Sequence, residues 1–419
     1  YQNVPFEIPD SWEWTTIGEI ASSICYGVSE SAKETGKYKL LRITDIQDNK
    51  VEWNSVPFTD YDEDKASAYL LQYGDILFAR TGATVGKSYL VESLSQQSIY
   101  ASYLIRVQTS TTILPQYIKR FFESGFYWEQ ISLNSVGIGQ PNVNGTTLAN
   151  IQIPIPPYNE QLRIVGEVDK WLSIIDGMEE EICDLKILAS LTKSNILDFA
   201  IHGKLVPQNP NDESAIELLK RINPHFTPCD TSHYANLPQG WTVTPLRNLC
   251  TTINGLWKGK KPPFINVGVI RNANFTKDFK LDFSNIAFLD VEEKQYEKRK
   301  LRYGDIIIEK SGGSDNQPVG RTILFSKMEG HYSFSNFTAV LRINENFPVL
   351  PKFLNLFLHN SYNKGVTKRM QTQTTGIHNL IFDQYLEIPV LIPPLAEQNR
   401  IINKIEMLFE LLNSISFEL

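Results

Sequence analysis

The stretch that decides the fold reads IPPYNEQLRI at residues 155–164, and it returns as IPPLAEQNRI at residues 392–401. Seven of the ten positions are identical at a constant offset of 237 residues. A match of this length at one fixed offset is the signature of an internal repeat. The two halves of the chain therefore correspond to each other position by position around this segment.

The repeat extends upstream with an offset that falls to 229 residues near the start of the chain. The matching pairs are Pro9 and Pro238, Trp12 and Trp241, Arg42 and Arg271, Tyr73-Gly74-Asp75-Ile76 and Tyr303-Gly304-Asp305-Ile306, Arg80-Thr81-Gly82 and Lys310-Ser311-Gly312, and Gly139 with Asn142 and Gly376 with Asn379. Insertions in loops between equivalent elements produce such a slow drift, so the sequence predicts a duplicated domain.

After each Pro-Pro pair the apolar residues recur at alternating steps of four and three. The first seam runs through Ile164, Val168, Trp171, Ile175, Met178, Ile182, Leu185, Ala189, Thr192, Ile196 and Phe199, and the second through Ile401, Ile405, Leu408, Leu412 and Ile415. This period predicts a left-handed coiled coil. For a single helix, ordinary core packing explains such a stripe equally well. Two seams in register favour burial against each other as an antiparallel pair, which would give the molecule a pseudo-two-fold axis.

We expect an α+β fold with two similar globular domains and two long helices. The predicted parts are a first domain at 1–157, a central spacer helix at 158–203, a linker with a short helix at 204–233, a second domain at 234–394 and a second, short spacer helix at 395–419. Apolar runs after Gly74-Asp75 and Gly304-Asp305 predict strands. Helices are expected just after Pro115 and Pro351, because proline is tolerated in a first turn.

Composition argues against several classes of protein. No run approaches the 18 apolar residues of a membrane span. The four cysteines, Cys25, Cys183, Cys229 and Cys250, have no C-x-x-C spacing, which predicts neither a zinc site nor a disulfide framework and fits a reducing cytoplasm. The six histidines show no ligand spacing. We therefore expect a cytoplasmic protein without metal or cofactor.

The charge is unevenly distributed along the chain. The net charge is −7, but residues 1–157 carry 11 Lys and Arg against 17 Asp and Glu, whereas residues 234–394 carry 20 against 13. A basic domain is typical of a surface that contacts phosphates, although a solvated face is a common alternative. The acidic first domain would have to gather its few cations, among them Arg42, Arg80, Lys87 and Arg106, on one face.

Two motifs suggest enzymes and fail on their chemistry. Gly82 to Ser88 resembles a P-loop but is one residue short, and the residues after it read as a strand instead of a helix. Ile155-Pro156-Pro157-Tyr158 resembles the Asp/Asn-Pro-Pro-Tyr motif of adenine methyltransferases, but Ile155 cannot accept hydrogen bonds from a target amine. We therefore expect no catalytic residues, and interpret the glycine-bounded segments as loops that present cations and hydroxyls.

Arg and Lys can bond phosphates or guanine edges, and Ser, Thr and Asn add contacts. For any one of these residues, a solvent-facing hairpin is an equally good explanation. The candidate DNA-binding residues are Arg42, Arg80, Thr81, Lys87, Asn142, Lys258, Lys260, Lys261, Arg271, Lys310, Ser311, Arg321 and Asn379.

The duplicated Ile-Pro, Pro-Pro, Glu-Gln, Arg-Ile signature, the Gly203-Lys204-Leu205-Val206-Pro207-Gln208 stretch and the two Tyr-Gly-Asp domains together resemble the specificity (S) subunit of Type I restriction-modification systems. The likeness covers essentially the whole chain. It implies two target-recognition domains that each read one half of an interrupted, asymmetric sequence in double-stranded DNA. It further implies that methyltransferase (M) subunits dock on the helices, that motor-nuclease (R) subunits join through the complex, and that the S subunit itself is not an enzyme.

The residues agree with this resemblance on one length. A seam of 36 residues spans roughly 50 Å at 1.5 Å per residue, enough to reach half-sites about one turn of B-DNA, or roughly 34–36 Å, apart. The second seam is shorter, which predicts either a truncated helix or a surface of the first seam, from Ile182 onward, that another protein covers. A coiled-coil scaffold with two protein-binding heads, and an uncatalogued nuclease or methyltransferase, are the alternative functions.

Overall fold

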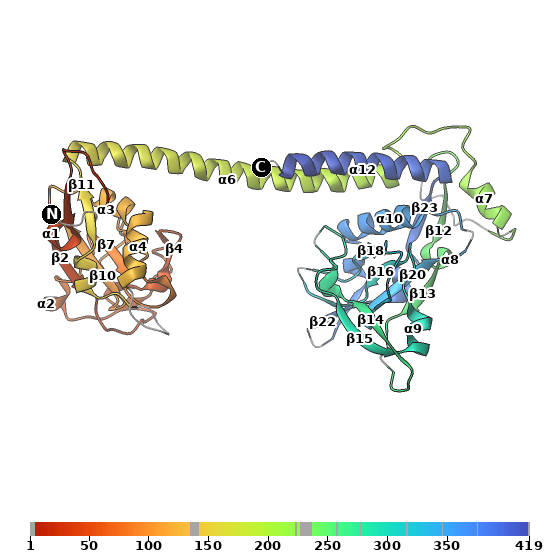
Figure 1. The fold of residues 1–419 in the computed structure, drawn as a ribbon, viewed down its shortest axis with the longest axis horizontal. Coiled ribbons are helices and arrows are strands. Elements are labelled where there is room, and N and C mark those ends of the chain that lie inside the picture. Colours follow the sequence, from red (N-terminus) through yellow and green to blue (C-terminus); the bar gives the residue numbers. More distant parts are fainter. Residues whose placement is uncertain are drawn as a thin grey trace. The chain divides into compact units, whose positions relative to one another are not determined.

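A computed structural model gives the structure of the chain, and it describes residues 5–134, 142–222, 224–226, 237–256, 259–276, 278–315, 317–345, 347–374 and 376–417. The chain divides into two compact units, Tyr1–Glu179 (unit 1) and Glu180–Leu419 (unit 2). Helices and strands are mixed in both (Figure 1). Within the described ranges, no helix is both long and apolar enough to cross a bilayer.

Unit 1 contains two main sheets and a closing strand pair. Its strands are the four-stranded sheet β2 (Ala21–Tyr26), β10 (Leu104–Thr109), β7 (Ile76–Ala79) and β8 (Ser88–Leu90), the three-stranded sheet β6 (Phe58–Thr59), β3 (Tyr38–Leu41) and β9 (Ser98–Tyr100), the pair β1 (Glu13–Thr16) and β11 (Gln152–Ile155), and the hairpin β4 (Ile46–Gln47) and β5 (Lys50–Val51). Its shorter helices are α1 (Ile17–Ile20), α2 (Glu63–Ala66), α3 (Pro115–Phe121), α4 (Gly125–Asn134) and α5 (Gly145–Ala149).

Both faces of the central strand β7 are covered, which explains its unbroken apolar sequence. Successive side chains of a strand point to opposite faces. Ile76 and Phe78 accordingly pack in a core with α3 and α4, while Leu77 and Ala79 pack in a second core on the other face. The expected strand after Gly74-Asp75 is thus confirmed, as is the helix that begins at Pro115.

Unit 2 repeats this order of strands. The equivalents are β13 (Cys250–Asn254), β20 (Thr338–Ile343), β16 (Ile306–Glu309) and β18 (Thr322–Leu324), then β15 (Ala287–Glu292), β14 (Phe264–Ile270) and β19 (Tyr332–Phe334), and the pair β12 (Thr242–Pro245) and β23 (Pro389–Ile392). A parallel pairing of strands also recurs, as β3 with β9 and β14 with β19. Unit 2 adds a sheet of β17 (Ser311–Gly313), β22 (Ile377–Leu380) and β21 (Gln371–Thr374), and its shorter helices are α7 (Ala215–Ile222), α8 (Leu246–Leu249), α9 (Glu293–Arg299), α10 (Pro351–Asn363) and α11 (Phe382–Tyr385).

The aspartate of each Tyr-Gly-Asp motif is buried and paired with an arginine from the neighbouring strand. In unit 2 the guanidinium of Arg342 lies 2.7 Å from both carboxylate oxygens of Asp305. In unit 1 the carboxylate of Asp75 lies 3.6 Å from Arg106, which also donates to two backbone carbonyls. Each carboxylate also accepts from a backbone N–H three residues earlier. The motif is therefore structural: its glycine takes a positive φ, and its aspartate ties the turn to the sheet.

Two long helices begin at the Pro-Pro pairs, α6 (Tyr158–Ile201) and α12 (Leu395–Phe417). Each helix start is fixed to its own unit by a buried glutamine. Gln161 accepts from the backbone N–H of Leu114 at 2.8 Å and donates to the carbonyl of Pro156 at 3.0 Å. Gln398 makes the same two contacts with Leu350 and Pro393 at the same distances.

Within unit 2, α12 lies antiparallel along the C-terminal part of α6 (Figure 1). Leu197 and Ile201 share a core with Ile401 and Ile405, and further along Lys193 donates to Asn413 at 2.6 Å. The antiparallel pair predicted from the two seams is therefore present. The expectation that the first seam lacks a partner from Ile182 onward was wrong for the C-terminal part of α6, because an antiparallel helix starts beside the end of its partner and covers that end first. The seam itself needs a correction there, since Leu197 and Ile201 are buried against α12 and the predicted Phe199 is exposed.

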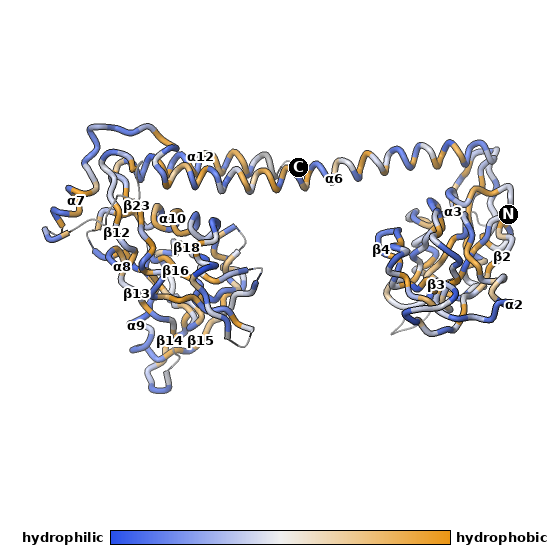
Figure 2. Tube along the Cα trace, turned by 180° about the vertical axis from the view of Figure 1, so that it is seen from behind, coloured by the Kyte–Doolittle hydropathy of each residue, from blue (hydrophilic) through white to orange (hydrophobic). Residues whose placement is uncertain are grey.

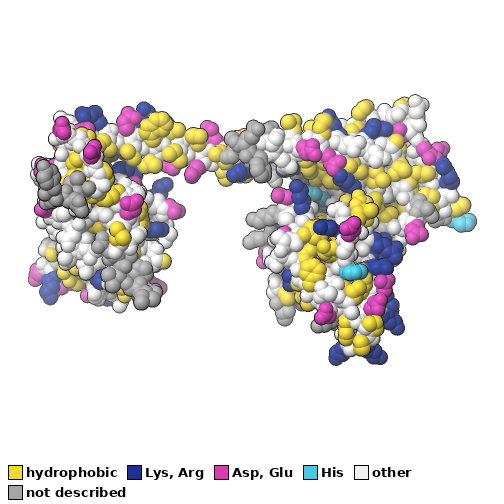
Figure 3. Space-filling view, viewed as in Figure 1, with side chains coloured by type: hydrophobic (Ala, Val, Ile, Leu, Met, Phe, Trp, Pro, Cys, Tyr) yellow, Lys and Arg dark blue, Asp and Glu magenta, His cyan; other side chains and the backbone are white. Residues whose placement is uncertain are grey.

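The seam residues differ in exposure along α6. Those before the paired part are exposed at Trp171, Ile175 and Met178, with exposed fractions of 60%, 47% and 56%. The hydropathy pattern continues through this part (Figure 2), and hydrophobic side chains are visible on its surface (Figure 3). Ile401 and Ile405 are buried, Ile164, Val168, Ile182, Ala189, Thr192, Ile196, Leu408 and Leu412 are half-buried, Leu185 and Phe199 are exposed, and the side chain of Ile415 lies outside the described residues.

The linker after α6 is held against α12 by a buried carboxylate. Gly203 ends the helix with φ 67° and leaves no room for a Cβ beside Pro238. Glu397 then accepts from Gln208 at 2.8 Å and from the indole of Trp241 at 3.0 Å. Burial raises the pKa of Glu397. The segment that carries the Gly-Lys-Leu-Val-Pro-Gln stretch is thus part of the unit 2 core.

The buried pair in unit 2 predicts a large loss of stability in Asp305→Asn. The substitution leaves the guanidinium of Arg342 without its anion, and breaking a buried pair costs about 3–5 kcal/mol. Urea unfolding of the full chain, followed by circular dichroism, measures this loss. Asp278→Asn, at an exposed carboxylate, is the matched control, and an equal loss in both variants would contradict the assignment.

Candidate nucleic-acid interface

In unit 2, two cations converge on the last residue of strand β13. Lys310 donates to the side-chain oxygen of Asn254 at 3.1 Å, and Arg299 donates to the backbone oxygen of the same residue at 3.2 Å. The ammonium of Lys310 and the guanidinium of Arg299 keep further N–H donors, since an ammonium carries three N–H bonds and a guanidinium five. This end of the sheet therefore holds two positive charges on a polar strand end.

Polar side chains from three further segments join this cluster. Ser311 bonds through its hydroxyl to the side-chain oxygen of Asn379, and Asn272 donates to the backbone oxygen of Ser311 at 2.6 Å. Gly312, with φ 106°, lets the chain turn beside Asn272. The sequence predicted Lys310 and Ser311 in one loop and Asn379 apart from it, and the structure brings all three together. We call Asn254, Arg271, Asn272, Lys310, Ser311 and Asn379 the unit 2 polar edge.

Arg271 and Arg42 occupy equivalent positions with different partners. Each precedes a short 3₁₀ turn, Asn272–Asn274 and Ile43–Asp45, and each donates its backbone N–H to the third residue of that turn at 2.9 Å. In unit 1 that residue is Asp45, whose carboxylate also binds the guanidinium of Arg42 at 2.6 and 3.0 Å. In unit 2 it is Asn274, which carries no charge. No acid among the described residues pairs with the exposed guanidinium of Arg271, so its charge is available to a ligand.

Unit 1 holds an arginine over the equivalent strand end. The guanidinium of Arg80 lies 4.9 Å from the ring centre of Tyr26, the last residue of β2. The neighbouring Thr81 forms a β-bridge with Asn142, as Ser311 pairs with Asn379 in unit 2. A cation thus lies at the same place in both units, on an aromatic ring in one and on an amide in the other.

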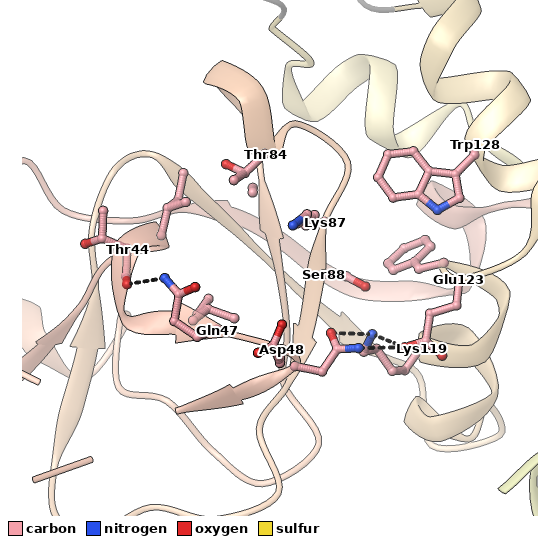
Figure 4. A pocket seen from close by; sticks show the side chains of 14 residues that line it. Thr44, Gln47, Asp48, Thr84, Lys87, Ser88, Lys119, Glu123 and Trp128 are labelled. Atoms are coloured by element: carbon pink, nitrogen blue, oxygen red, sulfur yellow. Dashed lines mark hydrogen bonds and ion pairs between the residues drawn. The ribbon is translucent and has the colours of Figure 1, made fainter. Parts of the chain in front are cut away.

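Lys87 lies beside a cavity of about 480 Å³ in unit 1. Figure 4 shows its ammonium between Thr84, Ser88 and Trp128, with hydrogen bonds linking Lys119 to its neighbours at one end of the cavity. Lys87 is exposed. It is therefore accessible to a ligand, and its contact with DNA stays a prediction.

Arg321 and Arg106 differ from what the sequence led us to expect. The guanidinium of Arg321 is only 11% exposed and forms a two-point ion pair with Glu309 at 2.8 and 3.1 Å. Arg106 is buried against Asp75. Both are corrections: these guanidinium groups hold the sheet together and are not available to phosphates.

The basic cluster at Lys258, Lys260 and Lys261 is only partly described. Lys258 lies outside the described residues. Lys260 and Lys261 are exposed, and their backbone N–H groups both donate to the carboxylate of Glu292 at 3.3 Å. Their ammonium groups extend from a turn that this carboxylate fixes.

Nothing in the described part of the chain resembles a metal centre, since no group of three or more His, Cys, Asp or Glu side chains converges there. The arrangement at the two strand ends consists of cations, amides and hydroxyls. Those groups donate hydrogen bonds to phosphates and base edges.

A family model described as the Type I restriction modification DNA specificity domain matches the chain twice, at residues 9–184 and 238–418. The chain belongs to this family. Both matches include a Tyr-Gly-Asp motif, a Pro-Pro pair and most of a spacer helix, so the duplication of the sequence is a duplication of the specificity domain.

Relatives named as specificity subunits cover nearly the whole chain. The Type I restriction enzyme EcoKI specificity subunit of Escherichia coli strain K12 is 22% identical over 96% of this chain and 83% of its own length. The EcoAI specificity subunit of Escherichia coli is 24% identical over 99% of this chain and 80% of its own length. The crystal structure of the HsdS subunit from Thermoanaerobacter tengcongensis shares the fold, with a TM-score of 0.56, 18% identity and coverage of 98% of this chain and 92% of that one.

The different partners of the two arginines predict different effects on DNA affinity. Arg271→Ala should weaken binding roughly tenfold and lower the slope of affinity against salt by about one, as loss of a single phosphate contact does. Arg42→Ala should have a smaller effect, because Asp45 already neutralises that guanidinium. Titration of duplex DNA at several salt concentrations measures both. A larger loss in Arg42→Ala would show that the polar edge is misassigned.

Proposed function

We propose that this chain is the sequence-recognition subunit of a Type I restriction-modification complex, in which each domain reads one half of an interrupted, asymmetric DNA site. The observation that carries the proposal is the duplicated domain with a cation, a hydroxyl and an amide at the same strand end in both copies. Duplex DNA offers phosphates and base edges at two places to such a pair of sites.

The two copies keep one scaffold and differ in the side chains at this edge. Tyr26 and Arg80 in unit 1 occupy the positions of Asn254 and Lys310 in unit 2. Direct readout depends on which donors and acceptors meet a base edge. Different side chains on the same scaffold are what reading two different half-sequences requires.

The exposed part of α6 supports a second element of the proposal, the docking of methyltransferase subunits. Trp171, Ile175 and Met178 present an apolar face to solvent. Exposed apolar surface of this kind is typical of interaction sites. Motor-nuclease subunits would join through the methyltransferases, and this chain would contribute recognition without catalysis.

Salt dependence tests the proposal against the scaffold alternative. The full chain, with and without its methyltransferase subunits, is titrated with duplex DNA at salt concentrations from roughly 50 to 300 mM, a range that includes the concentration of about 0.1 M at which the Debye length is about 10 Å. A recognition subunit should lose affinity steeply with salt. Absence of binding in both conditions would favour a protein scaffold, and turnover by the chain alone with metal or methyl donor would reveal an enzyme.

Exchange of residues 1–157 for the same domain of another family member should alter only one half of the methylated sequence. The reason is that each domain has its own cores and its own polar strand end. Mapping of methylated adenines in cells that carry the complex measures the outcome. A change in both halves would contradict independent reading by the two domains.

Deletion of residues 179–185 should bring the two half-sites closer by about three base pairs. Seven residues shorten a helix by roughly 10 Å while changing its phase by only about 20°, and one base pair rises about 3.4 Å. This deletion leaves Trp171, Ile175 and Met178 in place, and none of the deleted residues belongs to the main core of either unit. Asp184→Ala in the same segment is the control, and unchanged spacing of the methylated half-sites in the deletion would disprove the ruler role of α6.

A further inference from the structure

The hairpin of β7 and β8 in unit 1 and that of β16 and β18 in unit 2 have the same backbone and different contents. Ala79 and Glu309 occupy the same position. The N–H of Ala79 donates to Lys87 at 2.8 Å and its carbonyl accepts from Gly86 at 3.0 Å, while Glu309 makes these two contacts with Arg321 and Gly320 at 2.9 Å each. Lys87 is therefore the counterpart of Arg321.

In unit 2 an ion pair fills the space beside this hairpin. The carboxylate of Glu309 is buried, with a side-chain exposure of 2%, and both of its oxygens bind the guanidinium of Arg321. The guanidinium also lies 5.5 Å from the ring centre of Phe275. An anion and a cation thus occupy this position together under an aromatic ring.

Unit 1 keeps the cation and lacks the anion. Alanine in place of glutamate removes the carboxylate, and a cavity of about 480 Å³ lies beside Ala79 and Lys87. Its apolar walls come from Ile43, Ile46, Phe122 and Trp128, and most of the other lining side chains are polar. A volume of this size, with aromatic walls and polar groups beside them, is typical of small-molecule sites.

One polar group in the wall is left without a counter-charge among the described residues. No acid there pairs with the exposed ammonium of Lys87. The hydroxyl of Ser88 also lines the cavity and is buried without a hydrogen bond, but so is the hydroxyl of Thr322, which holds the same place in unit 2. The feature peculiar to unit 1 is therefore a cation without its carboxylate.

The other charged groups of the cavity do not compete for this place. Lys119 is buried and bound to Glu123 at 2.6 Å and to Asn49 at 3.2 Å, so Glu123 already has its cation. Asp48 is exposed, and water screens its charge. Among the described lining residues, Lys87 is then the cation that no carboxylate binds.

We propose that this cavity of unit 1 binds a small organic anion, with its acidic group at Lys87 and its apolar, planar body against Phe122 and Trp128. The bound acid group takes the place that the carboxylate of Glu309 holds in unit 2. Every residue that forms this site belongs to unit 1.

The test uses trifluoromethylbenzoate as the probe and the full chain as the receptor, with fluorine NMR to follow line broadening on binding. A planar ligand of this size should bind with a Kd on the order of 1 mM or tighter. Trifluoromethylbenzyl alcohol, which has the same body without the charge, should bind at least about tenfold more weakly, since it lacks a charge-assisted bond.

Two variants locate the probe. Ala79→Glu supplies the missing carboxylate from the chain itself and should abolish binding. Lys87→Ala removes the charged contact and should weaken binding roughly tenfold. Lys65→Ala, an exposed cation on another part of unit 1, is the matched control and should bind the probe like the unmodified chain.

Circular dichroism confirms that each variant is folded, and Lys87→Ala, at an exposed side chain, keeps the test valid if Ala79→Glu does not fold. Equal binding of the alcohol and the benzoate would overturn the requirement for an anion. Binding that persists unchanged in both Ala79→Glu and Lys87→Ala would overturn the site, as would the absence of saturable binding.

Discussion

The buried glutamine at the start of each long helix is the contact on which the architecture depends. Gln161 and Gln398 each join the first turn of their long helix to two other segments. One is the Pro-Pro segment before that helix, and the other is the residue directly before a shorter helix, α3 in unit 1 and α10 in unit 2. An amide that is buried and satisfied at both ends resists rotation, because turning it would leave polar groups without partners. The direction in which each helix leaves its own unit is therefore set inside that unit.

The two repeats separate what is kept from what is varied. The kept residues bond the scaffold internally: the aspartate of the Tyr-Gly-Asp motif with its arginine, and the glutamine at the helix start. The varied residues lie at the strand ends and in the hairpin, where Asp45 is replaced by Asn274 and Ala79 by Glu309. A scaffold that closes its own hydrogen bonds and ion pairs permits such changes, since they do not leave buried groups unpaired.

The spacing of the repeats and the heptad period of the apolar residues predicted most of the fold. Both are local patterns that the physics of strands and helices converts directly into structure, and the strand after Gly74-Asp75, the helix after Pro115 and the antiparallel pair of helices all followed from them. The partner of Arg321 did not follow, because Glu309 lies on another strand and nothing in the spacing of the sequence shows which side chains face each other. The same holds for Arg106 and Asp75. The cluster at Asn254 was missed for a related reason, since an asparagine at a strand end has no sequence signal of its own.

The apolar residues of α6 that α12 does not cover affect how much of the protein stays in solution. Burial of Trp171, Ile175 and Met178 away from water is favourable, so copies of the chain would associate with each other at high concentration. Copies synthesised in excess of their binding partners would be removed by aggregation and proteolysis. The stoichiometry of synthesis, and not the affinity of recognition alone, then limits how many working assemblies a cell maintains.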